Sequence, residues 1–226
     1  MTQTVAVMQP YFYPYAGYFS LVHAVDHFVL FDCVQFPRRG WVHRNRVPGP
    51  GGPEEWFTLP LARQPREVRI RDLAFAADAG ERLRIMVDRY PWLGGANDRA
   101  EAIRVQLLSA PDGSPAEFLA ASIKLCASVL GMKPSFSFSS NLGLGTELKG
   151  QDRVMAAVRA VGGTRYVNPS GGRVLYDRES FARNGLELAF LDPYRGPAWS
   201  MLYRLCTEAP SDLAKEIAEN ARPRLA

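Results

Sequence analysis

Cys33 and His43 are the residues whose types and spacing most clearly suggest chemistry. They lie in two segments rich in β-branched and aromatic residues, joined by a short link that contains a proline and a glycine. This pattern is typical of strand–loop–strand. If Gln35 and Trp41 close the loop, Cys33 faces His43 on one face of the hairpin, with Cβ atoms about 4.5–5.5 Å apart. An imidazole at that distance can take the thiol proton and create a thiolate nucleophile, but a one-residue slip would separate the two side chains.

A Cys–His pair usually needs a third group that orients the imidazole. Asn45 lies two residues after His43, on the same face of the expected strand. A carboxylate would hold the imidazolium better than an amide, and Glu147, just before an expected helix, is the carboxylate that we favour. The alternatives are Asp32, Glu54 and Glu55.

Acyl transfer also requires donors for an oxyanion. Gln9 is the first candidate because it ends a short apolar run, Val5–Met8, and precedes a proline; Gln35 is the second. The residues expected to stabilise an oxyanion or contact a substrate are Gln9, Gln35, Asn45, Tyr11 and Trp41.

Four arginines surround the expected pair: Arg38, Arg39, Arg44 and Arg46. A solvated sheet face is their default interpretation, and the alternative is a site for a phosphate or an acidic protein. The turn that contains Gly171 and Gly172 is a further candidate for ligand contact.

Composition limits the class of protein. The chain has 226 residues, 47% of them hydrophobic, with a net charge of +4, enough to bury one sizeable core in a single domain spanning 1–226. It lacks a long apolar run and the charge pattern of a signal peptide, so we expect a cytoplasmic protein without membrane contact. Three widely spaced cysteines fit neither a disulfide framework nor a zinc site, and Cys126 and Cys206 are interpreted as core residues. No basic run interleaved with aromatic residues indicates nucleic acid.

The order of expected elements indicates an α/β fold with a mixed sheet, an N-terminal antiparallel hairpin and flanking helices. We expect the hairpin over residues 28–47. Further strands are expected over residues 5–8, 56–61, 68–71, 135–139, 164–167 and 186–191. An aromatic-dense turn over residues 11–19 is expected to lead into a helix that ends at about residue 25. Further helices are expected over residues 114–130, 150–161 and 177–183 and from about 209, the first of these opening with a capping box, Ser114 to Glu117.

Four sequence blocks resemble the WbqC-like family: Met8–Phe19, Phe31–Gln35, Gly40–Arg46 and Tyr166–Gly172. The resemblance covers roughly residues 4 to 192. In the family pattern an aspartate stands where this chain has Cys33, and an asparagine where it has His43. A joint change to cysteine and histidine at positions expected to touch favours gained nucleophilic chemistry.

Within this family the chain most resembles the condensing enzymes of lincosamide antibiotic biosynthesis, in the celesticetin and lincomycin pathways. The resemblance implies a cysteine-protease-like site with a Cys-His-Glu triad, here Cys33, His43 and Glu147. It implies transfer of a proline-type acyl group from a peptidyl carrier protein thioester to an amino sugar, an ergothioneine-conjugated octose. The phosphopantetheine arrives on the carrier protein, so no bound cofactor or metal is expected. The alternatives are a cysteine hydrolase or thioesterase and a non-catalytic sugar-binding protein of polysaccharide biosynthesis.

Overall fold

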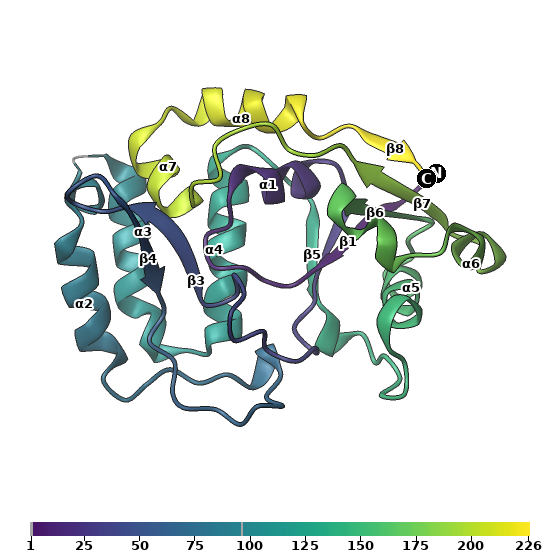
Figure 1. Cartoon of the computed structure of the whole chain (residues 1–226), viewed down its shortest axis with the longest axis horizontal. Coiled ribbons are helices and arrows are strands. Elements are labelled where there is room, and N and C mark those ends of the chain that lie inside the picture. Colours follow the sequence, from purple (N-terminus) through teal and green to yellow (C-terminus); the bar gives the residue numbers. More distant parts are fainter. Residues whose placement is uncertain (1, 96) are drawn as a thin grey trace.

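A six-stranded sheet forms the centre of the molecule in the order β5-β2-β1-β6-β7-β8 (Figure 1). The first five strands of this order run parallel, and β8 pairs antiparallel with β7 at one edge. The structure is a computed structural model and describes residues 2–95 and 97–226. The strands are β1 (Thr4–Met8), β2 (His27–Leu30), β5 (Ser135–Phe138), β6 (Arg165–Pro169), β7 (Glu187–Leu191) and β8 (Pro223–Leu225).

Helices cover both faces of this sheet, as Figure 1 shows. Alternation along β1 explains the two layers, because Val5 and Val7 pack in one core and Ala6 packs in the other. The smaller core contains α5 (Gly150–Ala160) and α6 (Arg178–Arg183). The larger core contains α1 (Ala16–His23), α2 (Ala79–Arg89), α3 (Asp98–Ser109), α4 (Pro115–Val129), α7 (Met201–Thr207) and α8 (Pro210–Glu219).

A separate antiparallel hairpin is formed by β3 (Arg44–Pro48) and β4 (Glu54–Thr58). The α/β class, the mixed sheet and the presence of a hairpin are therefore confirmed. The hairpin expected over residues 28–47 is wrong, because Phe28, Val29 and Leu30 are completely buried in a parallel strand between β1 and β5. A run that is apolar on both faces is typical of an interior parallel strand, which explains the position of β2. Strand β3 does not pair with β2 and pairs with β4, the strand that follows it in the sequence.

The remaining element predictions are largely confirmed. The capping box at the start of α4 is present, with the Ser114 hydroxyl accepting a hydrogen bond from the Glu117 amide at 3.2 Å. The strand expected over residues 68–71 is wrong, because this segment forms an isolated bridge, Gln35 to Arg69, and then a short 3-10 turn that begins at Ile70. In the described residues, none of the helices combines the length and apolar character needed to cross a membrane.

Candidate functional site

A pocket of about 620 Å³ opens at the carboxyl ends of β1, β6 and β7. The chain leaves β1 through α1 toward β2 on one side, and leaves β6 through α6 toward β7 on the other. Adjacent strands whose connections diverge in this way form a topological switch point, where open α/β sheets commonly bind ligands. Met8, Pro169 and Leu191, each the last residue of its strand, line the pocket.

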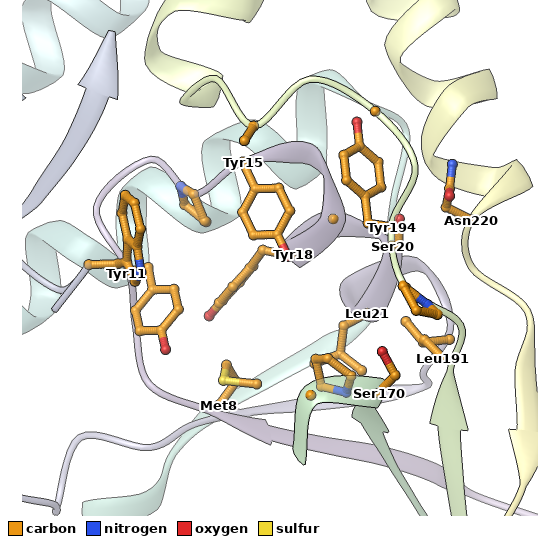
Figure 2. Close-up of a pocket in the computed structure, with 18 of the residues that line it drawn as sticks. Met8, Tyr11, Tyr15, Tyr18, Ser20, Leu21, Ser170, Leu191, Tyr194 and Asn220 are labelled. Atoms are coloured by element: carbon orange, nitrogen blue, oxygen red, sulfur yellow. The ribbon is translucent and has the colours of Figure 1, made fainter. Parts of the chain in front are cut away.

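Tyrosine rings dominate the wall of this pocket. Figure 2 shows Tyr11, Tyr15 and Tyr18 on one side of the open space, with Ser170 and Leu191 across it. The ring centroids of Tyr11 and Tyr18 lie 5.5 Å apart. Burial raises the pKa of all three phenols above their usual value. The three hydroxyls are therefore neutral. The Tyr18 hydroxyl donates a hydrogen bond to the Gln9 carbonyl, so those of Tyr11 and Tyr15 are the ones that can donate to a ligand.

The turn that precedes α1 places these tyrosines. Tyr13, at its centre, has a left-handed backbone with a φ of 37°. Buried Asn45 holds this turn, because its amide donates hydrogen bonds to the carbonyls of Phe12 and Tyr13 at 3.0 and 2.8 Å. The Ser200 hydroxyl donates to the same Tyr13 carbonyl at 2.6 Å. Asn45, which also lines the pocket, thus holds the turn in place, a role different from the orientation of His43 that its position predicted.

Only glycine fits at position 17, on the first turn of α1. A Cβ atom built there would lie 2.8 Å from the Cβ of Tyr194 and would overlap the ring of Tyr15. Those two rings meet edge to face across the glycine, with centroids 5.5 Å apart. The absence of a side chain at Gly17 is what allows the pocket wall to close.

The sequence model of the WbqC-like protein family matches residues 9–204, which include the tyrosine turn and all of the pocket lining except Met8 and Asn220. The chain belongs to the WbqC-like protein family. A curated protein of Mycobacterium tuberculosis, "Uncharacterized protein Rv1507c", is 39% identical over 57 residues. That similarity covers 25% of this chain and 24% of the mycobacterial protein. No solved structure matches the chain.

In this WbqC-like protein, Cys33 lies just beyond the end of β2 and is 6% exposed. Its backbone amide donates a hydrogen bond to the Ser139 hydroxyl at 3.2 Å. Its sulfur contacts Nη1 of Arg153 at 3.2 Å. Cys33 is absent from the lining of the tyrosine pocket, although the adjacent strand β1 ends in that pocket.

His43 occupies a different environment from Cys33. It directly precedes β3, and its ring packs edge to face against Phe36, with centroids 5.0 Å apart. Burial, followed by the nearby charge of Arg44, lowers the pKa of His43 to about 4. Its Nδ1 atom is buried and has no hydrogen-bond partner among the described residues. The predicted cross-strand pairing of Cys33 with His43 is wrong, because both residues lie outside strands and the flanking strands β2 and β3 belong to different sheets.

The carboxylates considered for the third position have other surroundings. Glu147 is exposed in the loop before α5, and none of the hydrogen bonds within residues 2–95 and 97–226 joins it to His43. Buried Asp32 accepts hydrogen bonds from the hydroxyls of Ser139 and Ser140 at 2.8 and 2.6 Å. Glu54 and Glu55 pair with arginines of the hairpin region and of α2.

Two glutamines were considered as oxyanion donors. The Gln35 amide donates to the carbonyl of Arg66 at 2.8 Å on the surface. The backbone carbonyl of Gln9 accepts a hydrogen bond from the Tyr18 hydroxyl at 3.0 Å. Neither glutamine lines the pocket, whereas Tyr11, Trp41 and Asn45, which were also considered, all do.

The arginines form an exposed stack with two tryptophans. The guanidinium of Arg44 lies 4.3 Å from the ring centroid of Trp56, and that of Arg46 lies 5.1 Å from the same centroid. The rings of Trp41 and Trp56 are 5.3 Å apart, and each side chain is 40% exposed. Arg39 lies beside this stack, because its carbonyl accepts a hydrogen bond from Arg44, whereas Arg38 donates to the Gln64 carbonyl.

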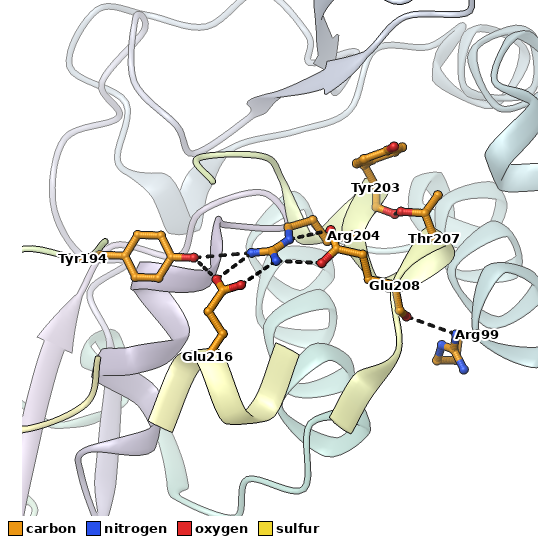
Figure 3. Close-up of polar contacts among 7 residues, drawn as sticks. All are labelled: Arg99, Tyr194, Tyr203, Arg204, Thr207, Glu208 and Glu216. Atoms are coloured by element: carbon orange, nitrogen blue, oxygen red, sulfur yellow. Dashed lines mark hydrogen bonds and ion pairs between the residues drawn. The ribbon is translucent and has the colours of Figure 1, made fainter. Parts of the chain in front are cut away.

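The C-terminal wall of the pocket depends on a buried ion-pair network that the sequence analysis missed. Figure 3 shows the guanidinium of Arg204 between Glu208 and Glu216, with the Tyr194 hydroxyl bonded to Glu216. The Arg204 side chain is 3% exposed, and its shortest contact to each carboxylate is 2.7 Å. Arginine and glutamate spaced four residues apart on a helix are a common surface pattern, so the sequence alone gave no sign that Arg204 is buried.

The described residues contain no group of three His, Cys, Asp or Glu side chains placed to bind a metal ion. The lining of the pocket includes one charged residue, Asp192, which pairs with Arg224 at 2.8 Å. The site thus offers aromatic surface, phenolic hydroxyls and little net charge. These properties suit a neutral or weakly cationic ring-bearing molecule.

Proposed function

We propose that this WbqC-like protein is a carrier-protein-dependent amide synthetase that joins an acyl group to the amine of a sugar. The observation that carries the proposal is the tyrosine-lined pocket at the switch point, beside the strand end that bears Cys33. In this proposal the pocket binds the sugar acceptor, and Cys33 holds the acyl group. The family assignment supports an enzyme in general terms and leaves the reaction to be tested.

The number of pocket hydroxyls that lack a protein acceptor supports a sugar as the ligand. The hydroxyls of Tyr18, Ser20 and Tyr194 already donate to protein acceptors. Those of Tyr11 and Tyr15 have no protein partner within the part of the chain that the structure describes. Aromatic faces pack against the C–H face of a sugar ring, and free phenols beside them can bond its hydroxyls.

The proposed reaction proceeds in two balanced steps. The sulfur of Cys33 attacks the carbonyl carbon of the carrier-bound thioester, and the pantetheine sulfur leaves with the bonding electrons and takes a proton. The sugar amine then attacks the acyl carbon of the acyl-enzyme, the bond to the Cys33 sulfur breaks, and the amine proton passes to solvent. The product is an amide, and the thioester supplies the driving force.

The exposed arginine–tryptophan stack supports a carrier-protein thioester as the acyl donor. It consists of Arg44, Arg46, Trp41 and Trp56. Guanidinium groups bind phosphate strongly, and Trp41 lies both in this stack and in the pocket lining. A phosphopantetheine arm crossing the stack would approach the pocket with its phosphate beside the arginines. Arg38 and Arg39 extend the same basic surface for an acidic carrier protein.

Mass spectrometry of the intact protein tests this function directly. After incubation with a prolyl-loaded carrier protein, we expect a mass gain of one prolyl group that maps to Cys33, absent in Cys33→Ser and present in Cys206→Ala. Addition of an amino sugar should then remove the adduct and yield the amide. Release as free proline, with or without the sugar, would indicate a hydrolase and contradict the proposal.

A non-catalytic sugar-binding protein is the second candidate. It is favoured by one observation: Cys33 does not line the pocket, and it has no hydrogen bond to His43 in the described residues. Sugar binding measured by calorimetry, together with no adduct on Cys33, would select this candidate over the synthetase.

A further inference from the structure

Arg153 is the charged group in contact with Cys33. It lies on the first turn of α5, and its guanidinium uses all three nitrogens. Nε donates to the Leu148 carbonyl at 2.8 Å, Nη2 donates to the Gly145 carbonyl at 2.9 Å, and Nη1 lies 3.2 Å from the Cys33 sulfur. The loop before α5 therefore fixes the plane of the guanidinium and directs its third nitrogen at the sulfur.

The backbone at Cys33 is also fixed by hydrogen bonds. The Ser139 hydroxyl accepts hydrogen bonds from the backbone amides of Asp32 and Cys33 at 3.1 and 3.2 Å, and donates to the Asp32 carboxylate at 2.8 Å. Asp32 also accepts from the Ser140 amide at 2.9 Å. The ends of β2 and β5 are thereby joined, so the sulfur has a defined position relative to Arg153.

The charge of Arg153 is not neutralised by a carboxylate. Among the ion pairs of residues 2–95 and 97–226, none includes Arg153, and its protein partners are two carbonyls and one sulfur. A cation held against a cysteine sulfur favours the reactive, negatively charged form. Fixed positive charge also stabilises negative charge that develops in a transition state.

We propose that Arg153, rather than His43, is the charge partner of Cys33. It stabilises the negative charge on the sulfur before the thioester is attacked. It does so again when the acyl–sulfur bond breaks and the electron pair returns to the sulfur. The inference rests on the proposed function for its reaction, but the contact itself predicts a reactive cysteine with any electrophile. His43 is unsuited to this role because its Nδ1 atom is buried against the protein and it makes no hydrogen bond to Cys33 in the described residues.

Alkylation kinetics test the assignment without a substrate. We would measure modification by iodoacetamide at neutral pH, with peptide mapping of each cysteine. Cys126 and Cys206 serve as internal references, because burial raises the pKa of both thiols, that of Cys206 to about 12. Cys33 should react fastest, and Arg153→Gln should slow its modification about tenfold or more, the usual effect of removing an adjacent opposite charge. Arg153→Lys, which keeps the charge but loses the two-carbonyl clamp, should lie between.

Two matched variants serve as controls. Arg159 lies on the same helix, is exposed and bonds Asn184 instead, so Arg159→Gln should alkylate like the wild type. His43→Gln should also leave the rate within about twofold, because within the described residues the sulfur is hydrogen-bonded to Arg153 and not to His43. Circular dichroism of each variant excludes misfolding as the cause of a slower rate.

Three outcomes would overturn the assignment: a Cys33 that reacts no faster than Cys126, an Arg153→Gln variant that alkylates at the wild-type rate, or a His43→Gln variant that loses as much reactivity as Arg153→Gln. The prolyl-carrier experiment separates this inference from the proposed function. If alkylation depends on Arg153 but no acyl adduct forms, the charge partnership stands and the synthetase is wrong. If the adduct forms equally in Arg153→Gln and wild type, the synthetase stands and the role of Arg153 is wrong.

Discussion

Replacing Glu216 by glutamine should destabilise the folded protein more than any other conservative change in α8. Glu216 shares the buried guanidinium of Arg204 with Glu208, and their side chains are 26%, 3% and 37% exposed. Removing the only partner of a buried charge costs about 3–5 kcal/mol. Because Glu208 remains bonded to Arg204, we expect a loss of about 2–3 kcal/mol in the free energy of unfolding, measured by urea denaturation.

The pH dependence of unfolding gives an independent reading of the same contact. The hydrogen bond from Arg204 lowers the pKa of the Glu216 carboxyl below its usual value. A carboxyl whose pKa is lower in the folded state contributes stability above its unfolded pKa and loses it as the pH falls through the folded pKa. The wild type should therefore lose stability below about pH 4.5, and the Glu216→Gln variant should lose less over the same range.

Glu219→Gln is the matched control, because Glu219 is one turn along and exposed. Exposed substitutions usually change stability by less than about 0.5 kcal/mol. If the free energies of unfolding of Glu216→Gln and Glu219→Gln differ by less than about 0.5 kcal/mol, the network does not hold the C-terminal helices to the pocket, and the reasoning is refuted.

Three further predictions concern the site and its supports. Burial lowers the pKa of His43 to about 4, so between about pH 4 and 6.5 the unfolded chain binds a proton at His43 that the folded chain does not. The free energy of unfolding should therefore fall as the pH drops from about 6.5 to about 4, and urea titrations of His43→Gln should show a weaker pH dependence. Gly17→Ala should lower the free energy of unfolding by about 1–3 kcal/mol by overpacking against Tyr194, and calorimetry should show weaker binding of the proposed sugar ligand. Gly80→Ala, which meets no atom closer than 4.0 Å, should do neither. Asp32→Asn should lower the free energy of unfolding by about 1.5–3 kcal/mol through lost charge-assisted hydrogen bonds. A melting temperature equal to that of the wild type would contradict this stabilising role of the Asp32 carboxylate.

Sequence patterns predicted the local elements better than their partners. The capping box located α4, and short apolar runs located β1, β6 and β7. The error at residues 28–47 arose because pairing was inferred from proximity in the sequence. Strand β2 is apolar on both faces, which indicates a buried parallel strand, but the pattern does not say which distant segment completes the sheet.

Residues that act through backbone contacts also escaped prediction. Asn45 was noticed as a polar residue near His43, but its bonds to the turn before α1 depend on the tertiary fold. Arg153 was not singled out from the sequence, since its contact with Cys33 spans 120 residues of sequence. Tyr11 and Trp41 were predicted as ligand contacts, and both line the pocket.

The part of the pocket wall that depends on α8 can change during evolution while the rest of the fold stays the same. The residues shared with the family end at position 204, yet Glu216 anchors Tyr194 and Asn220 lines the pocket from beyond that point. Mutations on the outer face of α8 can therefore move the ring of Tyr194 while the parallel strand ends stay unchanged. Exchanging this helix between relatives would therefore change the shape of the pocket without changing the strands that frame it.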